Sequence, residues 1–328
     1  MIGAAVIGLG VGEQHARAIA REPDAKLAWV YDHDRGRADA LARELGTRVA
    51  GSYEQILADP DIGVVALASY DDHHAAEVLA AFAAGKHVFC EKPLCRTPAE
   101  LAQIVAARGQ LHLQCNLILR AAPLYRWLRD AIRAGELGDV YAFDGDYLYG
   151  RLHKITDGWR KGVEDYSVIQ GGGVHLIDLM MWLLDEAPRR VTAAGNRIAT
   201  RDTEFRYLDF AAATYELPSG IIGRITANFA SVHKHQHVVR VFGTKATFIH
   251  DDAGARVYTQ RDPGSPARTI DLAPVAATKG DLVPFFLADV IARSDAAPAA
   301  RHEYAVITAC LAADRALATA QPQPIEYV

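Results

Sequence analysis

Three glycines, Gly8, Gly10 and Gly12, lie between a short apolar run and a segment of helical composition. Glycine at such a turn lets the backbone approach a phosphate closely, and the first amides of the following helix then face the phosphate oxygens. We therefore expect a dinucleotide pyrophosphate to bind at Gly8, Gly10, Val11 and Gly12. A strict G-x-G-x-x-G pattern would need glycine where Glu13 stands, so a simple tight turn is the alternative.

An acidic residue ends the second predicted strand. Asp32 lies about 20 residues after Gly12, where a carboxylate accepts hydrogen bonds from the adenosine ribose and repels a 2′-phosphate. The sequence therefore predicts NAD as the cofactor, with NADP disfavoured. Asp34 competes for the same role, and Arg35 and Arg37 leave some use of NADP open.

Two further segments carry side chains suited to proton transfer. Lys92 directly follows a predicted strand and lies between Glu91 and Pro93, at the edge where parallel sheets place their ligands. His175 and Asp178 share one face of a predicted helix, three residues apart. A neutral imidazole in a cleft accepts a proton near pH 7. A surface lysine and a capping or packing histidine are the alternatives.

The elements that position these residues alternate regularly in the first third of the chain. Strands are expected at Ala4–Ile7, Lys26–Tyr31, Val64–Ala68, His87–Cys90 and Leu111–Cys115. Helical patterns separate them at Gln14–Arg21, Arg35–Leu45, His73–Ala84 and Pro98–Arg108. This alternation predicts an α/β domain built on a parallel sheet with right-handed crossovers, which we place at residues 1–119.

The pattern changes near residue 120. Long segments of period-two alternation, among them a hairpin of Leu208–Leu217 and Ile221–Phe229, predict a mainly antiparallel sheet. The helix Val174–Leu184 interrupts these strands, and helices at Leu282–Ser294 and His302–Thr319 close the chain. We expect residues 120–328 to form an α+β domain.

One strand of this second domain carries four aromatic residues on one side, namely Tyr141, Phe143, Tyr147 and Tyr149. Such a side forms either a subunit interface or a core face beneath helices. An uncovered aromatic face is an apolar patch that monomers rarely expose. We therefore expect a homodimer or homotetramer that associates through this sheet.

A loop and a histidine strand complete the candidates. Trp159, Arg160 and Tyr166 precede a glycine run, where they could grip a phosphate or base of a nucleotide-linked sugar. A surface loop anchored by one tryptophan is the alternative. Three histidines alternate and are expected on one strand face, but carboxylates at metal-binding spacing are absent, so we expect no metal; they are His233, His235 and His237.

The composition excludes several classes of protein. The chain has 328 residues, half of them apolar, and a net charge of −5, without the basic patch that nucleic-acid binding requires. No uncharged apolar stretch approaches the roughly 20 residues needed to span a bilayer. The sequence runs from Met1 directly into a strand, which argues against a signal peptide. Four cysteines without C-x-x-C spacing are typical of reduced thiols, so we expect a cytoplasmic protein.

Four segments together resemble the Gfo/Idh/MocA oxidoreductases, the family of glucose–fructose oxidoreductase and inositol dehydrogenase. The segments are Gly8–His15, Ser69–His74, Ala84–Leu94 and Gly173–Asp178. The resemblance implies a Rossmann domain followed by an open-faced sheet domain. It also implies hydride transfer between NAD(P) and a hydroxyl-bearing carbon of a sugar, nucleotide-linked sugar or cyclitol. A dinucleotide-binding regulatory or sensor protein without turnover is the alternative.

The resemblance also suggests roles for single residues. Lys92 and His175 would be catalytic, and the cofactor would further contact Ser69, Asp71, His74, Glu91 and Lys92. Substrate contacts are expected at Tyr149, Trp159, Arg160, Tyr166 and Asp178.

The sequence departs from the family pattern in three places. The glycine loop is one residue shorter before His15, and Ser69-Tyr70-Asp71 stands where Thr-Pro-Asn is usual. Gly171 occupies a position that often holds an aspartate, so either Lys92 and His175 handle the proton alone or Asp178 compensates. An aspartate introduced at position 171 is expected to be tolerated.

Overall fold

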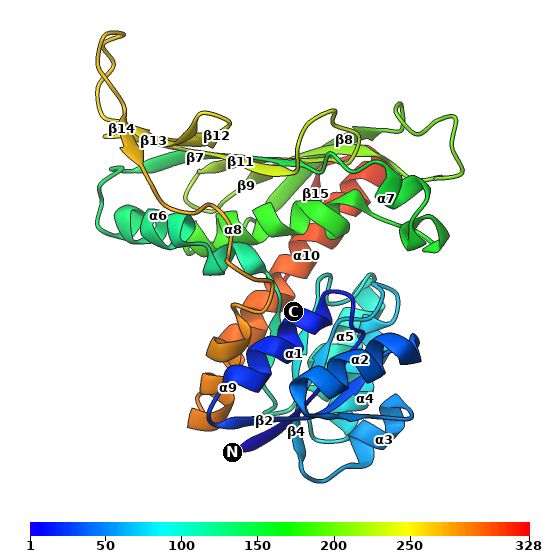
Figure 1. Cartoon of the computed structure of the whole chain (residues 1–328). Coiled ribbons are helices and arrows are strands. Elements are labelled where there is room, and N and C mark those ends of the chain that lie inside the picture. Colours follow the sequence, from blue (N-terminus) through cyan, green and yellow to red (C-terminus); the bar gives the residue numbers. More distant parts are fainter. The chain divides into compact units, whose positions relative to one another are not determined.

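The computed structural model describes residues 1–328, which divide into two compact units (Figure 1). The first comprises residues 1–118, 276–305 and 328, and the second comprises residues 119–275 and 306–327. The first unit thus holds the expected Rossmann segment together with a later stretch of about 30 residues. No helix of the chain combines the length and apolar character that crossing a membrane would require.

The first unit is built on a parallel sheet, as predicted, and this sheet has six strands where five were expected. Its order is β3-β2-β1-β4-β5-β6, and the order reverses between β1 and β4, where doubly wound sheets bind ligands at their carboxyl edge. The strands are β1 (Ile2–Ile7), β2 (Ala25–Tyr31), β3 (Arg48–Val49), β4 (Ile62–Leu67), β5 (His87–Cys90) and β6 (Leu113–Cys115).

Local capping signals set the bounds of several helices in this unit. Thr97 and Glu100 form a reciprocal capping box at the start of α5, and the Asp34 carboxylate caps α2, which ends at Gly46 with a positive φ of 66°. The helices are α1 (Gly12–Arg21), α2 (Arg35–Leu45), α3 (Tyr53–Ala58), α4 (His74–Ala83), α5 (Pro98–Ala107) and α9 (Val283–Ala292).

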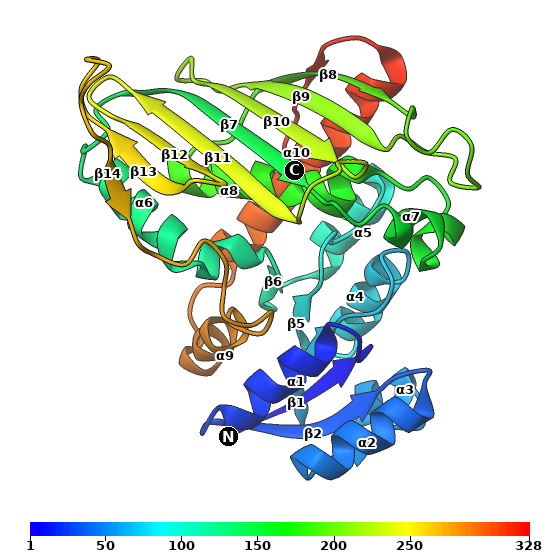
Figure 2. The ribbon, with the colours of Figure 1, turned by 45° about the horizontal axis from the view of Figure 1, so that its top comes forward.

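The second unit is built on a nine-stranded sheet in the order β14-β13-β12-β11-β7-β10-β9-β8-β15 (Figure 2). Its strand pairs are antiparallel except β10 with β7, which are parallel, so the sheet is mixed but mainly antiparallel as expected. The strands are β7 (Val140–Leu148), β8 (Arg190–Asn196), β9 (Phe210–Glu216), β10 (Ile222–Asn228), β11 (Gln236–Gly243), β12 (Thr247–Asp251), β13 (Gly254–Tyr258), β14 (Arg268–Ile270) and β15 (Gln323–Pro324).

Helices of the second unit pack against one face of this sheet. They include α6 (Pro123–Arg133) and α8 (Val174–Leu184), together with the part of α10 (Ala297–Thr319) that belongs to this unit. A short helix, α7 (His153–Thr156), lies in the loop after β7. Phe143 and Tyr147 of β7 are buried on the helix-covered face, whereas Tyr141 is 55% exposed at the strand end.

The opposite face of this sheet is polar. Asp144 pairs with Arg224 at 2.6 Å, and Asp146 pairs with Arg240 at 3.1 Å. The aromatic side of β7 is therefore a core face beneath helices. The expectation that the sheet exposes an aromatic apolar patch is wrong, because α8 covers that side.

Candidate active site

The glycine turn after β1 combines a tight backbone with an open surface. Gly8 has a positive φ of 79° and donates its N–H to the Tyr31 carbonyl at 2.8 Å, and a Cβ on Gly8 would overlap the backbone of Ala68. No atom lies within 4 Å of the place where a Cβ on Gly10 would sit. A Cβ on Gly12 would lie 3.0 Å from the Ala68 side chain, so this glycine lets α1 pack closely on the sheet.

These three positions fit the needs of a dinucleotide pyrophosphate. Such a group requires a tight first turn, room for close backbone approach and close packing of the helix whose amides face the phosphates. In this shorter loop Gly12 has the packing role, and it is also the first residue of α1. Val11 is 40% exposed beside it. The missing glycine at position 13 therefore does not remove the packing function.

Asp32 lies at the end of β2 and is bonded to the glycine turn. Its Oδ2 accepts from the Leu9 N–H at 2.6 Å and its Oδ1 accepts from the Asp34 N–H at 2.8 Å. Arg37 Nη1 lies 3.8 Å from Asp32 Oδ2. Because the Asp34 side chain is engaged in capping α2, Asp32 is the better candidate for the ribose contact.

Glu91 and Lys92 follow β5 at the same edge of the sheet. The Glu91 carboxylate accepts from His15 Nε2 at 3.0 Å and from Asn116 Nδ2 at 2.6 Å. Burial alone would raise the pKa of Glu91, but His15, the nearby charge of Lys92 and the Asn116 hydrogen bond together lower it to about 2. The carboxylate thus stays charged, links α1 to the ends of β5 and β6, and fixes the backbone that carries half-buried Lys92.

The loop after β4 is tied to the Lys92 segment by a buried histidine. His74 is fully buried, and its Nδ1 lies 2.7 Å from the Pro93 carbonyl while its Nε2 lies 3.3 Å from the Ser69 carbonyl. Ser69 Oγ donates to Glu77 at 2.5 Å, and Asp71 is 7% exposed in the same loop. With both ring nitrogens facing protein carbonyls, His74 is placed to position these loops, and this burial does not favour its predicted direct contact with the cofactor.

His175 is the second residue of α8 in the second unit. Tyr147 stacks on its imidazole with ring centroids 6.2 Å apart and an angle of 19° between the ring planes. The His237 ring meets it edge-on at 5.9 Å. The side chain is 9% exposed. Aromatic rings therefore hold the imidazole from two sides.

Aromatic side chains occupy the space beside the backbone of Gly171 and Gly172 in the glycine run before His175. Residues Ile169–Gly173 form a π-helical turn that continues into α8. A Cβ on Gly172 would collide with Tyr147 and would lie 2.7 Å from Phe229, and one on Gly171 would fall on the Tyr166 hydroxyl. An aspartate at position 171 therefore clashes with Tyr166, contrary to the expectation that it would be tolerated.

Asp178 is buried in an ion pair. Its side chain is 0% exposed, and Arg120 approaches both carboxylate oxygens, with Nε 3.0 Å from each and Nη2 2.5 Å from Oδ1. This geometry is a bidentate pair that joins α8 to the turn before α6. The predicted substrate contact by Asp178 is not favoured, because the carboxylate is enclosed and engaged by the guanidinium.

The remaining predicted substrate residues lie in the same unit as His175. Tyr149 is 8% exposed and packs 4.7 Å from the Phe229 ring. Trp159 and Arg160 belong to the 3₁₀ turn Trp159–Gly162, where the Arg160 guanidinium lies 4.4 Å from the Trp159 ring centroid. Tyr166 is 6% exposed. Trp159 and Arg160 are therefore the more accessible of the four.

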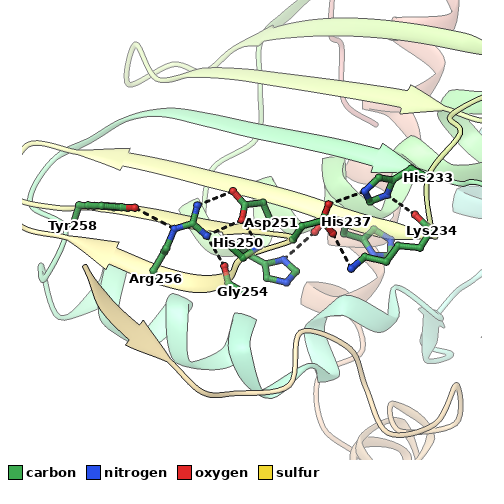
Figure 3. A network of polar contacts seen from close by, with 10 residues as sticks. His233, Lys234, His237, His250, Asp251, Gly254, Arg256 and Tyr258 are labelled. Carbon is green, nitrogen blue, oxygen red and sulfur yellow. Dashed lines mark hydrogen bonds and ion pairs between the residues drawn. The ribbon is translucent and has the colours of Figure 1, made fainter. Parts of the chain in front are cut away.

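The three alternating histidines do not share one surface. His237 is buried in β11 beside His235, with ring centroids 5.1 Å apart, and its carbonyl accepts from His250 Nδ1 at 3.0 Å (Figure 3). His233 lies before the strand and pairs with Asp252 at 2.8 Å. The prediction that all three point to one face is therefore wrong. No group of three or more histidine, cysteine, aspartate or glutamate side chains in residues 1–328 has a metal-binding arrangement.

Sequence reasoning assigned no site role to four residues that contact His175 or Glu91. Tyr147 and His237 pack on His175, and His15 and Asn116 hold Glu91. Asn116 carried a usable signal, because it directly follows a parallel strand and so lies at the ligand-binding edge. The others become neighbours only through the fold.

The chain is similar to known oxidoreductases along most of its length. Residues 2–117 match the oxidoreductase family with an NAD-binding Rossmann fold, and residues 125–249 match the GFO/IDH/MocA C-terminal domain. Inositol 2-dehydrogenase 1 of Saccharopolyspora erythraea is 32% identical over 76% of this chain and 80% of its own length.

A further relative matches only part of the sequence, and a solved structure shows the same fold. Inositol 2-dehydrogenase of Acidothermus cellulolyticus is 34% identical over 58% of this chain, and the match spans only 56% of that relative. The structure of levoglucosan dehydrogenase in complex with NADH superposes with a TM-score of 0.87, at 21% identity and full coverage of both chains. The two family matches, the dehydrogenase alignment and the shared two-part fold together show that the chain belongs to the GFO/IDH/MocA family of oxidoreductases.

Proposed function

We propose that the chain is an NAD-dependent oxidoreductase acting on a hydroxyl-bearing carbon of a sugar, nucleotide-linked sugar or cyclitol. The observation that carries the proposal is the shared sheet edge. The glycine turn follows β1 and Lys92 follows β5, with only β4 between these strands. A cationic side chain is thereby held beside the place where the cofactor would bind.

The residues have distinct roles in this proposal. The backbone at Gly8, Gly10 and Gly12 binds the pyrophosphate, and Asp32 binds the adenosine ribose. When bound, the nicotinamide ring supplies the carbon that accepts or returns a hydride. Lys92 hydrogen-bonds the reacting hydroxyl, and its positive charge lowers the pKa of that hydroxyl. His175 then accepts or relays the proton.

The proposed substrate class rests on the relatives and on the second unit. Relatives that match this chain include inositol 2-dehydrogenases and a 1,5-anhydro-D-fructose reductase of Ensifer adhaerens. Trp159, Arg160 and Tyr149 supply an indole, a guanidinium and a phenol in the unit that carries His175. Aromatic faces and cationic donors are suited to sugar rings and to phosphate-linked sugars. We propose these three side chains as substrate contacts.

The direct test is turnover. Purified protein is incubated with NAD and a panel of myo-inositol, scyllo-inositol, glucose and a nucleotide-linked glucose, and the absorbance of reduced nicotinamide is followed. Oxidation of at least one panel member is expected, and Lys92→Ala should bind NAD without reducing it. Tight NAD binding without turnover of any member would instead support the sensor alternative.

Cofactor choice provides a second prediction, centred on Asp32 and its neighbour Arg37. Wild-type protein should bind NAD more tightly than NADP, because the carboxylate repels a 2′-phosphate. Asp32→Ser should raise NADP affinity relative to NAD, since Arg37 would lose its nearby carboxylate and could pair with the phosphate. Titration of each cofactor against each variant measures the ratio.

Two arginine variants separate Arg37 from a general charge effect. Arg35 pairs with Asp39 at 3.1 Å, so Arg35→Ala in the Asp32→Ser background should keep the gain in NADP affinity. Arg37→Ala in the same background should abolish it. Tighter binding of NADP by the wild type would contradict the role assigned to Asp32.

Assembly and location are also proposals. We propose a homo-oligomer that associates through the open face of the nine-stranded sheet, where Ile222 is 41% exposed on the same side of β10 as Arg224. Wild-type protein should sediment as a dimer or larger, and Arg224→Glu should shift it toward monomer by placing like charges beside Asp144. A wild-type monomer would refute this.

All four cysteines are free and buried, which supports a reducing, cytoplasmic location.

A further inference from the structure

The hydroxyl of Tyr166 occupies the side-chain space of another residue. A Cβ built on Gly171 would fall on Tyr166 Oη and would lie 2.9 Å from Cζ of the same ring. The ring itself is anchored by Phe205 and Phe229, whose centroids lie 5.9 and 6.2 Å away. The Tyr166 hydroxyl therefore takes up space that a side chain at position 171 would need.

A buried acidic clamp fixes the segment between Tyr166 and Gly171. Asp314 of α10 accepts from Ser167 Oγ at 2.6 Å and from Gln170 Nε2 at 2.8 Å. Ser167 Oγ also accepts from the Gln170 N–H at 3.1 Å. Burial raises the pKa of Asp314 to about 6, although both hydrogen bonds oppose this rise. Hydrogen bonds to Asp314 of α10 thus hold the π-helical turn in place.

Helical geometry connects this hydroxyl to His175. Side chains four residues apart share one face of a helix, and the π-helical turn that holds Gly171 continues into α8, which holds His175. Because a Cβ on Gly171 would clash with Tyr166 Oη, this hydroxyl lies beside the helix face that the His175 side chain shares. The rings of Tyr147 and His237 pack against the His175 imidazole.

We propose that Tyr166 is the residue that positions His175, its hydroxyl serving as the polar group that orients the imidazole from position 171. The inference rests on the proposed function, because it assigns to His175 a proton-handling role. It also revises the expected role of Tyr166, which acts through His175 and does not grip the substrate. Nearly complete burial of the phenol agrees with this placement.

Tyr166→Phe tests the proposal with little disturbance of packing, because only the hydroxyl is removed. We expect kcat to fall about 10-fold or more, as a misplaced catalytic group predicts, with KM for NAD unchanged and the acidic limb of the pH–rate profile displaced. Tyr215→Phe is the matched control. It removes another buried phenol hydroxyl, bonded to the Ala309 carbonyl of α10, and should change neither kcat nor the pH profile.

A spectroscopic measurement is independent of turnover. The His175 imidazole is assigned in NMR spectra by its loss in His175→Gln, and its pKa is then titrated in each variant. Loss of one hydrogen bond should shift that pKa by about half a unit or more in Tyr166→Phe and leave it unchanged in Tyr215→Phe. An unshifted pKa and an unchanged pH profile would overturn the proposal. Absence of turnover in the wild type would refute only the proposed function.

Two variants test whether Tyr166 and a side chain at position 171 compete for the same space. Gly171→Asp alone should lose activity, because its Cβ collides with Tyr166. The double variant Tyr166→Ala/Gly171→Asp should recover activity relative to either single variant, since the aspartate then supplies the polar group. If Gly171→Asp is fully active and adding Tyr166→Ala gives no benefit, the two side chains do not compete for one place and the inference fails.

Discussion

His175→Ala is expected to lower turnover by about 100-fold or more, because a positioned acid–base group typically contributes between about 10² and 10⁴ to the rate. NAD affinity should hardly change, since His175 belongs to the second unit and the glycine turn to the first. Initial rates on the panel substrate and a separate NAD titration measure the two quantities. Near-full turnover in His175→Ala would show that the proton acceptor lies elsewhere.

Lys92→Ala should cause a comparable loss, and the two losses should not add. Residues that act as one catalytic unit are grossly non-additive, because removing either one already disables the shared step. The double variant Lys92→Ala/His175→Ala should therefore be only slightly slower than either single variant. Additive losses in the double variant would mean that the two side chains serve separate steps.

Arg120→Met should destabilise the fold strongly, because it leaves the fully buried carboxylate of Asp178 without its guanidinium. Breaking a buried ion pair by removing one partner costs about 3–5 kcal/mol in the free energy of unfolding. Urea unfolding followed by circular dichroism measures this loss. The variant should unfold at markedly lower urea, and its α8 helix should lose its fixed position first.

Two controls separate ion pairing from the loss of a long side chain. Lys161 pairs with Glu204 at 3.1 Å, but both side chains are exposed, so Lys161→Met should cost about 0–1 kcal/mol. The double variant Arg120→Met/Asp178→Leu should regain much of the stability lost in Arg120→Met, because no buried charge remains. If Arg120→Met is as stable as Lys161→Met, Asp178 is not held by this pair.

Elements with strong local signals could be predicted well from the sequence. The predicted helices Arg35–Leu45 and Val174–Leu184 and the strand His87–Cys90 have the bounds observed in the structure. Capping by Asp34 and termination at Gly46 are encoded within a few residues. The strands β3, β8, β14 and β15 were not expected, and β3, β14 and β15 have only two or three residues each, too few to show an alternating pattern.

Topology and coverage of the second sheet could not be predicted in full. Parallel pairing of β10 with β7 joins strands about 80 residues apart, which no local pattern specifies. No local pattern specifies which element covers the aromatic side of β7 either. Alternation identified the aromatic face, but whether a helix or a second subunit covers it depends on where α8 packs.

For the candidate site, sequence reasoning identified residues whose type and position at the end of a predicted strand or the start of a predicted helix suit a functional role. They are the residues of the glycine turn, Asp32, Lys92 and His175. It could not identify partners that only the fold brings near. Asp178 is 58 positions from Arg120, and Gln170 is 144 positions from Asp314. Asp178, three residues from the candidate catalytic His175, was therefore interpreted as a substrate ligand before its buried partner Arg120 was known.

We expect this chain to move a hydride between NAD and a carbon that bears a hydroxyl group. Deuterium transfer tests this directly, with scyllo-inositol, myo-inositol and glucose deuterated at every carbon, each incubated with wild-type protein and NAD. The mass of the reduced cofactor is measured by mass spectrometry. At least one substrate should place one deuterium on the nicotinamide ring with the wild-type protein, and none should be transferred by His175→Ala at equal reaction time. NAD bound by folded protein, with no deuterium transferred from any of the three, would contradict it.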